Sequence, residues 1–247
     1  MSDALTMAGR SLRLSARSPE ALLTALFLPV MLMVVFVYLF GGAISTGTRY
    51  ITYVVPGVLL LCAGVGSATT AVTVSRDMAG GIIDRLRSMD VGSLPLLSGH
   101  VAASVVRNAA STVLVFAVAL GIGFRPHASP AAWVAAAGVL LLYVLAISWL
   151  AAAFGLLVSS PEAANAFMFV PMIMAYASSA FVPVRTMPSW LHGVAGHQPA
   201  TPVIETMRGL LLGTGVGANG WQAVAWCGGI IVGSVGLSAA AFRRRTR

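Results

Sequence analysis

Long apolar runs limit what this chain can fold into. Six of them are long enough for a helix of roughly 20 residues, which crosses about 30 Å of hydrocarbon. They lie near residues 21–40, 51–74, 102–124, 131–158, 163–183 and 221–242. We therefore predict an all-α integral membrane protein with six transmembrane helices, forming one domain over residues 1–247. No cleavage motif of small residues closes the first run, so we expect it to stay as a span.

The composition excludes a soluble enzyme and a disordered chain. Charged residues make up 9% of the sequence, against about 25% in soluble domains. All 15 basic residues are Arg, so the lysine of a P-loop is missing, and we expect the chain to bind no ATP and no other cofactor itself. The net charge of +8 lies in clusters between the apolar runs, which is typical of topology signals rather than of nucleic-acid binding.

The arginines also predict the orientation of the spans. Eleven arginines fall on the side that holds both termini and four on the other, so the positive-inside rule places both termini in the cytoplasm. Abundant Ala, Gly, Val and Arg without Lys are typical of GC-rich bacteria, so we expect a multi-pass protein of a bacterial plasma membrane. In residues 1–20 the arginines share one helical face and apolar residues share another, which favours an interfacial helix. The alternative is a plain topology signal without defined structure.

Several kinds of functional site are missing from the pattern. No Asp or Glu falls inside a predicted span, which argues against an ion-coupled carrier. No catalytic Ser or His motif and no metal-binding spacing occurs, and we expect Cys62 and Cys227 to be inert buried thiols. Arg107 and Asn108 form the deepest polar pair, and we expect Arg107 to extend to the cytoplasmic interface.

The loop between the second and third spans mixes charges of both signs with apolar residues at helical spacing. Ile82, Leu86 and Met89 share one face of the predicted helix, while Asp77, Asp84 and Arg87 share another. A surface of mixed sign suits a protein partner better than an anionic bilayer, which would prefer Arg alone. The sequence therefore predicts a short amphipathic helix that binds a cytoplasmic partner.

The outer loop from Phe181 to Gly217 is too long and too apolar to be a plain connector. It contains four prolines, Trp190 and a run of three leucines from Leu210, and we predict two short helices that turn back toward the membrane. Glu205 and Arg208 stand at i and i+3, so we expect them to pair as a local stabilising contact.

In these two loops the sequence resembles the permease subunits of type-2 ABC exporters, of the daunorubicin-resistance type. The resemblance implies an ATPase-coupling segment and an outer re-entrant segment. The coupling residues it implies are Asp77, Gly81, Ile82, Asp84, Arg85, Leu86, Arg87 and Met89. The outer residues it implies are Met187, Pro188, Trp190, Pro199, Pro202, Glu205 and Arg208. Asp90, His100 and Ser104 depart from the family pattern, which has Pro, Arg and an acidic residue at these places.

The same resemblance implies a second permease copy, a homodimer in the simplest case, and two cytoplasmic ATPase subunits that carry ATP and Mg. Small residues at Gly64 with Ala68, and at Gly229 with Gly233, would let helices approach closely. We expect export of a hydrophobic or amphipathic molecule: a drug, a natural product or a lipid. Two alternatives stay open, which are export of a lipid-linked polysaccharide and an ATP-independent membrane scaffold or immunity protein.

Overall fold

The computed structural model describes residues 27, 29–42, 44, 49–80 and 93–245, and within these ranges it contains helices and no strand. The shorter elements are the helix Pro29–Phe40, which ends in the π-helical turn η1 (Phe36–Phe40), then α7 (Pro161–Asn165), η2 (Ala166–Met168), α8 (Phe169–Tyr176), η3 (Val184–Thr186), α9 (Ser189–His197) and α10 (Ala200–Leu212). The long ones are α3 (Tyr50–Ala79), α5 (Ser93–Ile122), α6 (Pro130–Leu157) and α11 (Asn219–Arg245).

The four long helices are long and apolar enough to cross a membrane. They coincide with the second, third, fourth and sixth predicted spans, so an all-helical chain of the membrane type is confirmed. Two bounds differ from the prediction: α3 continues to Ala79 rather than ending near 74, and α5 begins at Ser93 rather than near 102. Both helices therefore extend toward the loop that joins them.

The remaining two predicted spans are described only in part or end early. The first is described from Pro29 to Phe40, and most of residues 21–28 lie outside the described residues. The fifth is built from α7, η2 and α8 and ends at Tyr176, a rise of about 24 Å against the 30 Å of a bilayer core. Pro171 explains why α7 and α8 do not form one continuous helix. Proline is tolerated in the first turn of a helix, and α8 begins two residues before Pro171.

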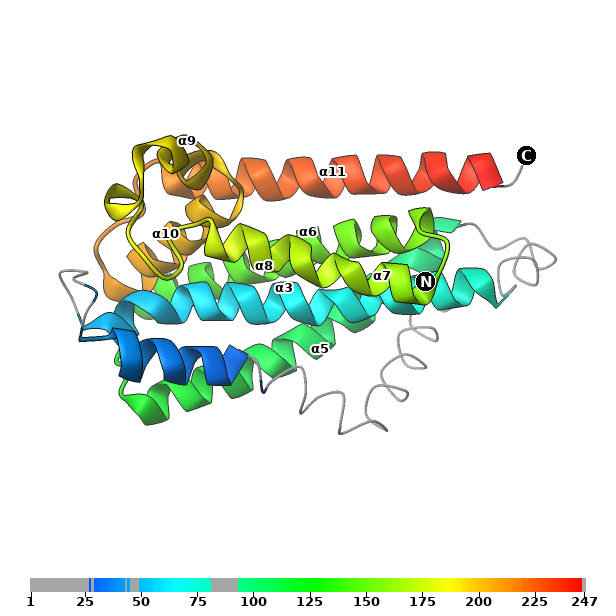
Figure 1. The fold of residues 1–247 in the computed structure, drawn as a ribbon. Coiled ribbons are helices and arrows are strands. Elements are labelled where there is room, and N and C mark those ends of the chain that lie inside the picture. The colour runs from blue at the N-terminus through cyan, green and yellow to red at the C-terminus, as the bar shows by residue number, and fades with distance from the viewer. Residues whose placement is uncertain (1–26, 28, 43, 45–48, 81–92, 246–247) are drawn as a thin grey trace.

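Helix α3 lies at the centre of the bundle. It packs against α5, α6, α7, α8 and α10, while α11 packs on α6 and α10 (Figure 1). In the most apolar stretch of α3, 83% of the residues are buried, against 22% in α5 and in α11. Gly64 of α3 faces Pro171 so closely that a Cβ would overlap the proline ring, which supports its predicted packing role. Gly229 and Gly233 of α11 meet no neighbour within the described chain.

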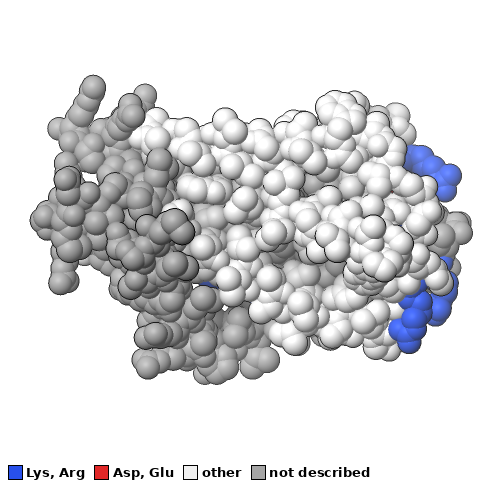
Figure 2. All heavy atoms as spheres, turned by 180° about the vertical axis from the view of Figure 1, so that it is seen from behind, with Lys and Arg blue, Asp and Glu red and all other residues white. Residues whose placement is uncertain are grey.

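The two ends of the bundle differ in what covers them. Helices α9 and α10 gather at one end, which we name the cap end, and α3 ends and α5 begins at the other, the loop end (Figure 1). Figure 2 shows a broad middle that is almost free of charged side chains, with arginines at one end. Large apolar side chains project outward along this middle, among them Val113, Val134 and Val232, each at least 67% exposed. Such a surface suits lipid rather than water.

Candidate functional site

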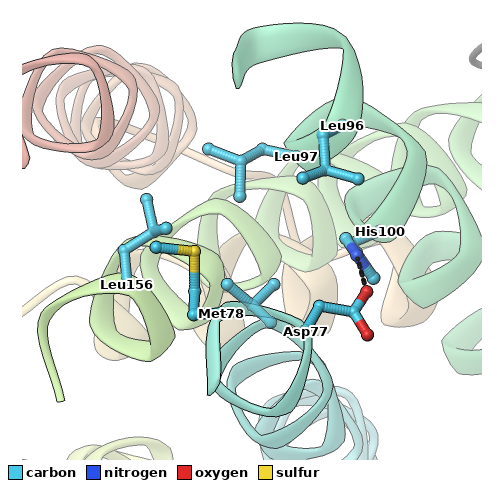
Figure 3. A pocket seen from close by; sticks show the side chains of 7 residues that line it. Asp77, Met78, Leu96, Leu97, His100 and Leu156 are labelled. Carbon is cyan, nitrogen blue, oxygen red and sulfur yellow. Dashed lines mark ion pairs between the residues drawn. The ribbon is translucent and has the colours of Figure 1, made fainter. Parts of the chain in front are cut away.

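At the loop end, one ion pair joins the last turn of α3 to α5. Nε2 of His100 lies 3.0 Å from Oδ2 of Asp77, and both side chains point toward each other beside a small pocket (Figure 3). Val74 and Met78 of α3, Leu96 and Leu97 of α5 and Leu156 of α6 line this pocket. His100, one of the departures from the family pattern, therefore has a partner in the first of the predicted coupling residues.

The rest of the predicted coupling segment cannot be placed. Gly81, Ile82, Asp84, Arg85, Leu86, Arg87 and Met89, together with Asp90, lie outside the described residues. What the structure does describe are the two flanks of this segment, α3 up to Gly80 and α5 from Ser93. The Asp77–His100 pair and the apolar contacts around it hold these flanks together, so residues 81–92 connect two helices that are already joined.

The start of α7 lies near the same end and is capped from its own sequence. The Ser160 hydroxyl accepts a hydrogen bond from the Ala163 amide, Pro161 occupies the first helical position, and Glu162 stands in the first turn. The backbone amide of Glu162 and the Ser160 hydroxyl lower the pKa of the exposed Glu162 carboxyl, and Arg76 of α3 lowers it further. A negative charge in the first turn is stabilised by the partial positive charge of the helix N-terminus.

At the cap end, Arg208 of α10 reaches across to α3 and to the end of α8. Its Nη2 donates to the carbonyl oxygens of Tyr53 at 3.0 Å and Ser179 at 2.9 Å, and its Nη1 lies 2.6 Å from Oε1 of Glu205. The guanidinium carbon also stacks 3.6 Å from the centre of the Tyr53 ring. The predicted Glu205–Arg208 pair is confirmed, but Arg208 does more than stabilise its own helix, because it joins three segments.

Other contacts hold the same region together. The Gln198 amide donates to the carbonyls of Met174 at 2.8 Å and Ala177 at 2.6 Å, satisfying acceptors at the end of α8. The Tyr50 hydroxyl donates to the carbonyl oxygen of Phe181 at 2.8 Å. Sequence reasoning named neither Gln198 nor Tyr50, and no spacing rule would have found them, since each contact depends on where distant segments meet.

The other predicted outer residues have mainly structural positions. Pro188 and Pro199 precede the first residues of α9 and α10, and Pro202 is buried in the first turn of α10. The Met187 carbonyl pairs with the ring of His192 at 2.8 Å. Trp190 is 76% exposed on α9. The two short helices predicted here are thus present, and the outer set and Asp77 lie at opposite ends of α3.

A polar cluster lies between these ends, and the sequence analysis recognised only its Arg107–Asn108 pair as polar. It consists of Ser67 and Thr70 of α3, Ser104, Arg107 and Asn108 of α5, and Ser148 of α6. Nδ2 of Asn108 donates to the hydroxyl oxygens of Ser67 and Ser104, each at 3.2 Å, and Ser148 donates to Ser104 at 2.9 Å. The spacing of Ser104 and Asn108 at i and i+4 was the available signal.

Arg107 lies further along its helix than predicted. Its Nη2 donates to the Thr70 hydroxyl oxygen at 3.0 Å, so the side chain lies against α3. The reason is the early start of α5 at Ser93, which places Arg107 at the middle of a 30-residue helix. Hydrogen bonds between polar side chains inside a membrane bundle contribute roughly 0.6–2 kcal/mol each, so this cluster joins α3, α5 and α6.

The described residues hold no other site of recognisable chemistry. They contain no group of three or more His, Cys, Asp and Glu side chains that could hold a metal ion. Cys62 and Cys227 are free and buried, as predicted.

Comparison with known proteins gives a consistent picture. The sequence model of the ABC-2 type transporter family matches residues 3–212. The daunorubicin resistance ABC transporter permease protein DrrB1 of Streptomyces coeruleorubidus is 27% identical over 216 residues, which cover 87% of this chain and 76% of that protein. The probable doxorubicin resistance ABC transporter permease protein DrrC of Mycobacterium tuberculosis is 25% identical over 237 residues, covering 94% and 85%. The putative transport permease ycf38 of Cyanophora paradoxa is 26% identical over 200 residues, covering 78% and 68%.

Proposed function

The chain belongs to the ABC-2 type transporter family, and we propose that it is the membrane-spanning permease subunit of an ATP-driven exporter. The observation that carries the proposal is the family match over residues 3–212, on a bundle whose four long apolar helices suit a membrane. The permease performs no catalysis in this proposal. Hydrolysis of ATP with Mg takes place on separate cytoplasmic ATPase subunits, and the permease works as a pair, in the simplest case a homodimer.

The proposed topology has six spans with both termini in the cytoplasm of a bacterial cell. In it the loop end faces the cytoplasm and the cap end faces outward, with α9 and α10 as the outer re-entrant helices. The arginine distribution supports this orientation. The short fifth segment, α7 to α8, would then cross only with the turn from Ala177 to Ala180 completing its path. Labelling of single cysteines introduced at the two ends tests this topology.

The proposed coupling works through the flanks of residues 81–92. The ATPase subunits bind this segment and move it when ATP draws them together. Because Asp77 and His100 link α3 to α5, a displacement of the segment moves both helices as a unit. A change from an inward-open to an outward-open arrangement of the spans follows as a population shift.

The proposed substrate is a hydrophobic or amphipathic molecule. Two of the relatives named above are called resistance proteins, one for daunorubicin and one for doxorubicin, which favours a drug or natural product over a lipid. Export of a lipid-linked polysaccharide by the same machinery is the alternative. A deletion strain separates the two, because it becomes drug-sensitive in the first case and loses a surface polymer in the second.

The partner is tested by purification of the tagged protein from native membranes in mild detergent. We expect a soluble Walker-motif ATPase to co-purify, and we expect Arg85→Glu together with Arg87→Glu to remove it. Arg49→Glu, on the opposite side of the predicted topology, is the matched charge-reversal control. Cysteine labelling checks that neither variant has changed its orientation. Recovery of the permease without an ATPase in several detergents would favour the scaffold alternative.

A further inference from the structure

Arg107 is a cation at the middle of α5, and no carboxylate among the described residues pairs with it. It is residue 15 of the 30 in this helix. We propose that Arg107 is the anion-recognising residue of a binding site within the bundle, and that the site takes the carboxylate or phosphate of an amphipathic molecule. An ionisable side chain at membrane depth is costly, so it is kept where it has a function.

The hydrogen bonds of the guanidinium support this proposal. In the described part of the chain its one hydrogen bond runs from Nη2 to Thr70, and its buried Nε has no acceptor at all. A buried donor without an acceptor costs free energy, and a cation without an anion costs more. An anionic oxygen from outside the chain, bound beside the partly exposed Arg107 side chain, would supply the missing counter-charge.

The surroundings hold the guanidinium in place. Thr70 is 2% exposed, and next to Arg107 the buried Asn108 donates to Ser67 and Ser104. Asn108 also fills the space over Gly66, where a Cβ would overlap its Oδ1. The base of Arg107 is thus fixed between α3 and α5, so little conformational entropy is lost when an anion binds.

The exposed surroundings of Arg107 suit an amphipathic anion rather than a free inorganic one. Arg107 itself is partly exposed, and its neighbour Val106 is 48% exposed on the outer face of α5. On α3, the hydroxyls of Thr69 and Thr73 already donate to the carbonyls of Gly66 and Thr69. Arg107 is therefore the donor to the acidic group, and its planar fork fits a carboxylate or a phosphate.

Two sources can supply such a group: an anionic membrane lipid or the transported molecule. The binding of the anion needs neither ATP nor a partner. Its identification with the substrate rests on the proposed exporter function.

The test uses the full-length permease alone in phosphatidylcholine nanodiscs. The probes are the fluorescent carboxylate dansylundecanoic acid and its uncharged methyl ester, and the readout is the saturable binding of each. We expect the acid to bind the native protein about tenfold tighter than the ester. Arg107→Gln removes this preference, Arg107→Lys keeps part of it, and Arg125→Gln keeps it in full, since Arg125 is exposed and bonds only to nearby carbonyls.

Equal binding of acid and ester to the native protein, or an unchanged preference in Arg107→Gln, would overturn the proposal. A melting temperature for each variant shows that the bundle is intact. In nanodiscs containing phosphatidylglycerol, loss of acid binding identifies a lipid phosphate as the occupant, and persistence identifies a transported acid. Because no ATPase is present, this result stands or fails independently of the pull-down that tests the exporter.

Discussion

Different interactions stabilise the cap end and the loop end of the bundle. At the cap end, a buried arginine, a glutamine and a tyrosine donate to backbone carbonyls of other segments, so each polar contact fixes the path of the main chain. At the loop end, one partly exposed ion pair and a few apolar side chains join α3 to α5. The first arrangement resists displacement and the second tolerates it, which is what an anchored outer end and a driven inner end would need.

The largest effect is expected from Arg208→Met, which leaves the carbonyls of Tyr53 and Ser179 without their donor and Glu205 without its partner. Because these groups are buried or half-buried, we expect a loss of about 3 kcal/mol in the free energy of unfolding. Thermal unfolding in detergent measures it, with Arg185→Met on the exposed η3 as the matched control. Equal melting temperatures for the two variants would remove the distinction between the ends.

An intermediate effect is expected from Gly66→Ala between the two ends. The added Cβ overlaps Oδ1 of Asn108, whose amide nitrogen is held by two serines, so the cluster has to shift at a cost of about 1–3 kcal/mol. Gly121→Ala on α5, where nothing lies within 4 Å, is the control. The double change Gly66→Ala and Asn108→Ala should recover part of the loss, and a purely additive result would contradict the overlap.

A smaller effect on stability is expected from Asp77→Asn at the loop end. The carboxylate side chain is 22% exposed, and partly exposed ion pairs contribute about 1 kcal/mol or less. In the proposed function this variant nevertheless lowers transport, because α3 and α5 no longer move together. Transport into inverted vesicles, normalised to ATPase activity, measures this effect. A loss of stability as large as that of Arg208→Met, with transport unchanged, would reverse the comparison.

The smallest effect is expected from Trp190→Ala at the surface of the cap end. The side chain is 76% exposed, so its loss should change the free energy of unfolding in detergent by less than about 0.5 kcal/mol. Quenching of its fluorescence by brominated lipids, in a protein whose other tryptophans are replaced by Phe, measures its depth. Quenching from the outer leaflet supports the re-entrant position of α9, and its absence argues against it.

The sequence predicted the elements far better than the contacts between them. Apolar runs located the four long helices, and prolines with Trp190 indicated α9 and α10, because these signals are local. The Glu205–Arg208 pair was found for the same reason, as its spacing follows from helix geometry. The fifth span was predicted too long, since a run of apolar residues does not reveal the turn that follows Tyr176.

Contacts between distant segments of the bundle could not be predicted from the sequence. Arg107 was expected near the end of its helix because that helix was predicted to start too late, and the Thr70 contact could not be seen without knowing that α3 and α5 lie together. His100 was recognised only as a departure from the family pattern, and in the structure it is the partner of Asp77. Each of these depends on residues at least 23 positions apart.

The central position of α3 also has a consequence for how the protein is made. Among the described elements, all neighbours that bury α3 except the Pro29–Phe40 helix follow it in the chain, and the last of them is α10. During synthesis, α3 must therefore leave the ribosome and enter the membrane well before Arg208 exists to bind Tyr53. The hydroxyls of Ser67 and Ser104 can meet Asn108 once α5 has followed α3, but both lack Ser148 until α6 arrives. A chain that stops after α8 would thus lack the Arg208 contacts at the cap end. Such an incompletely folded chain would be a substrate of quality-control proteases.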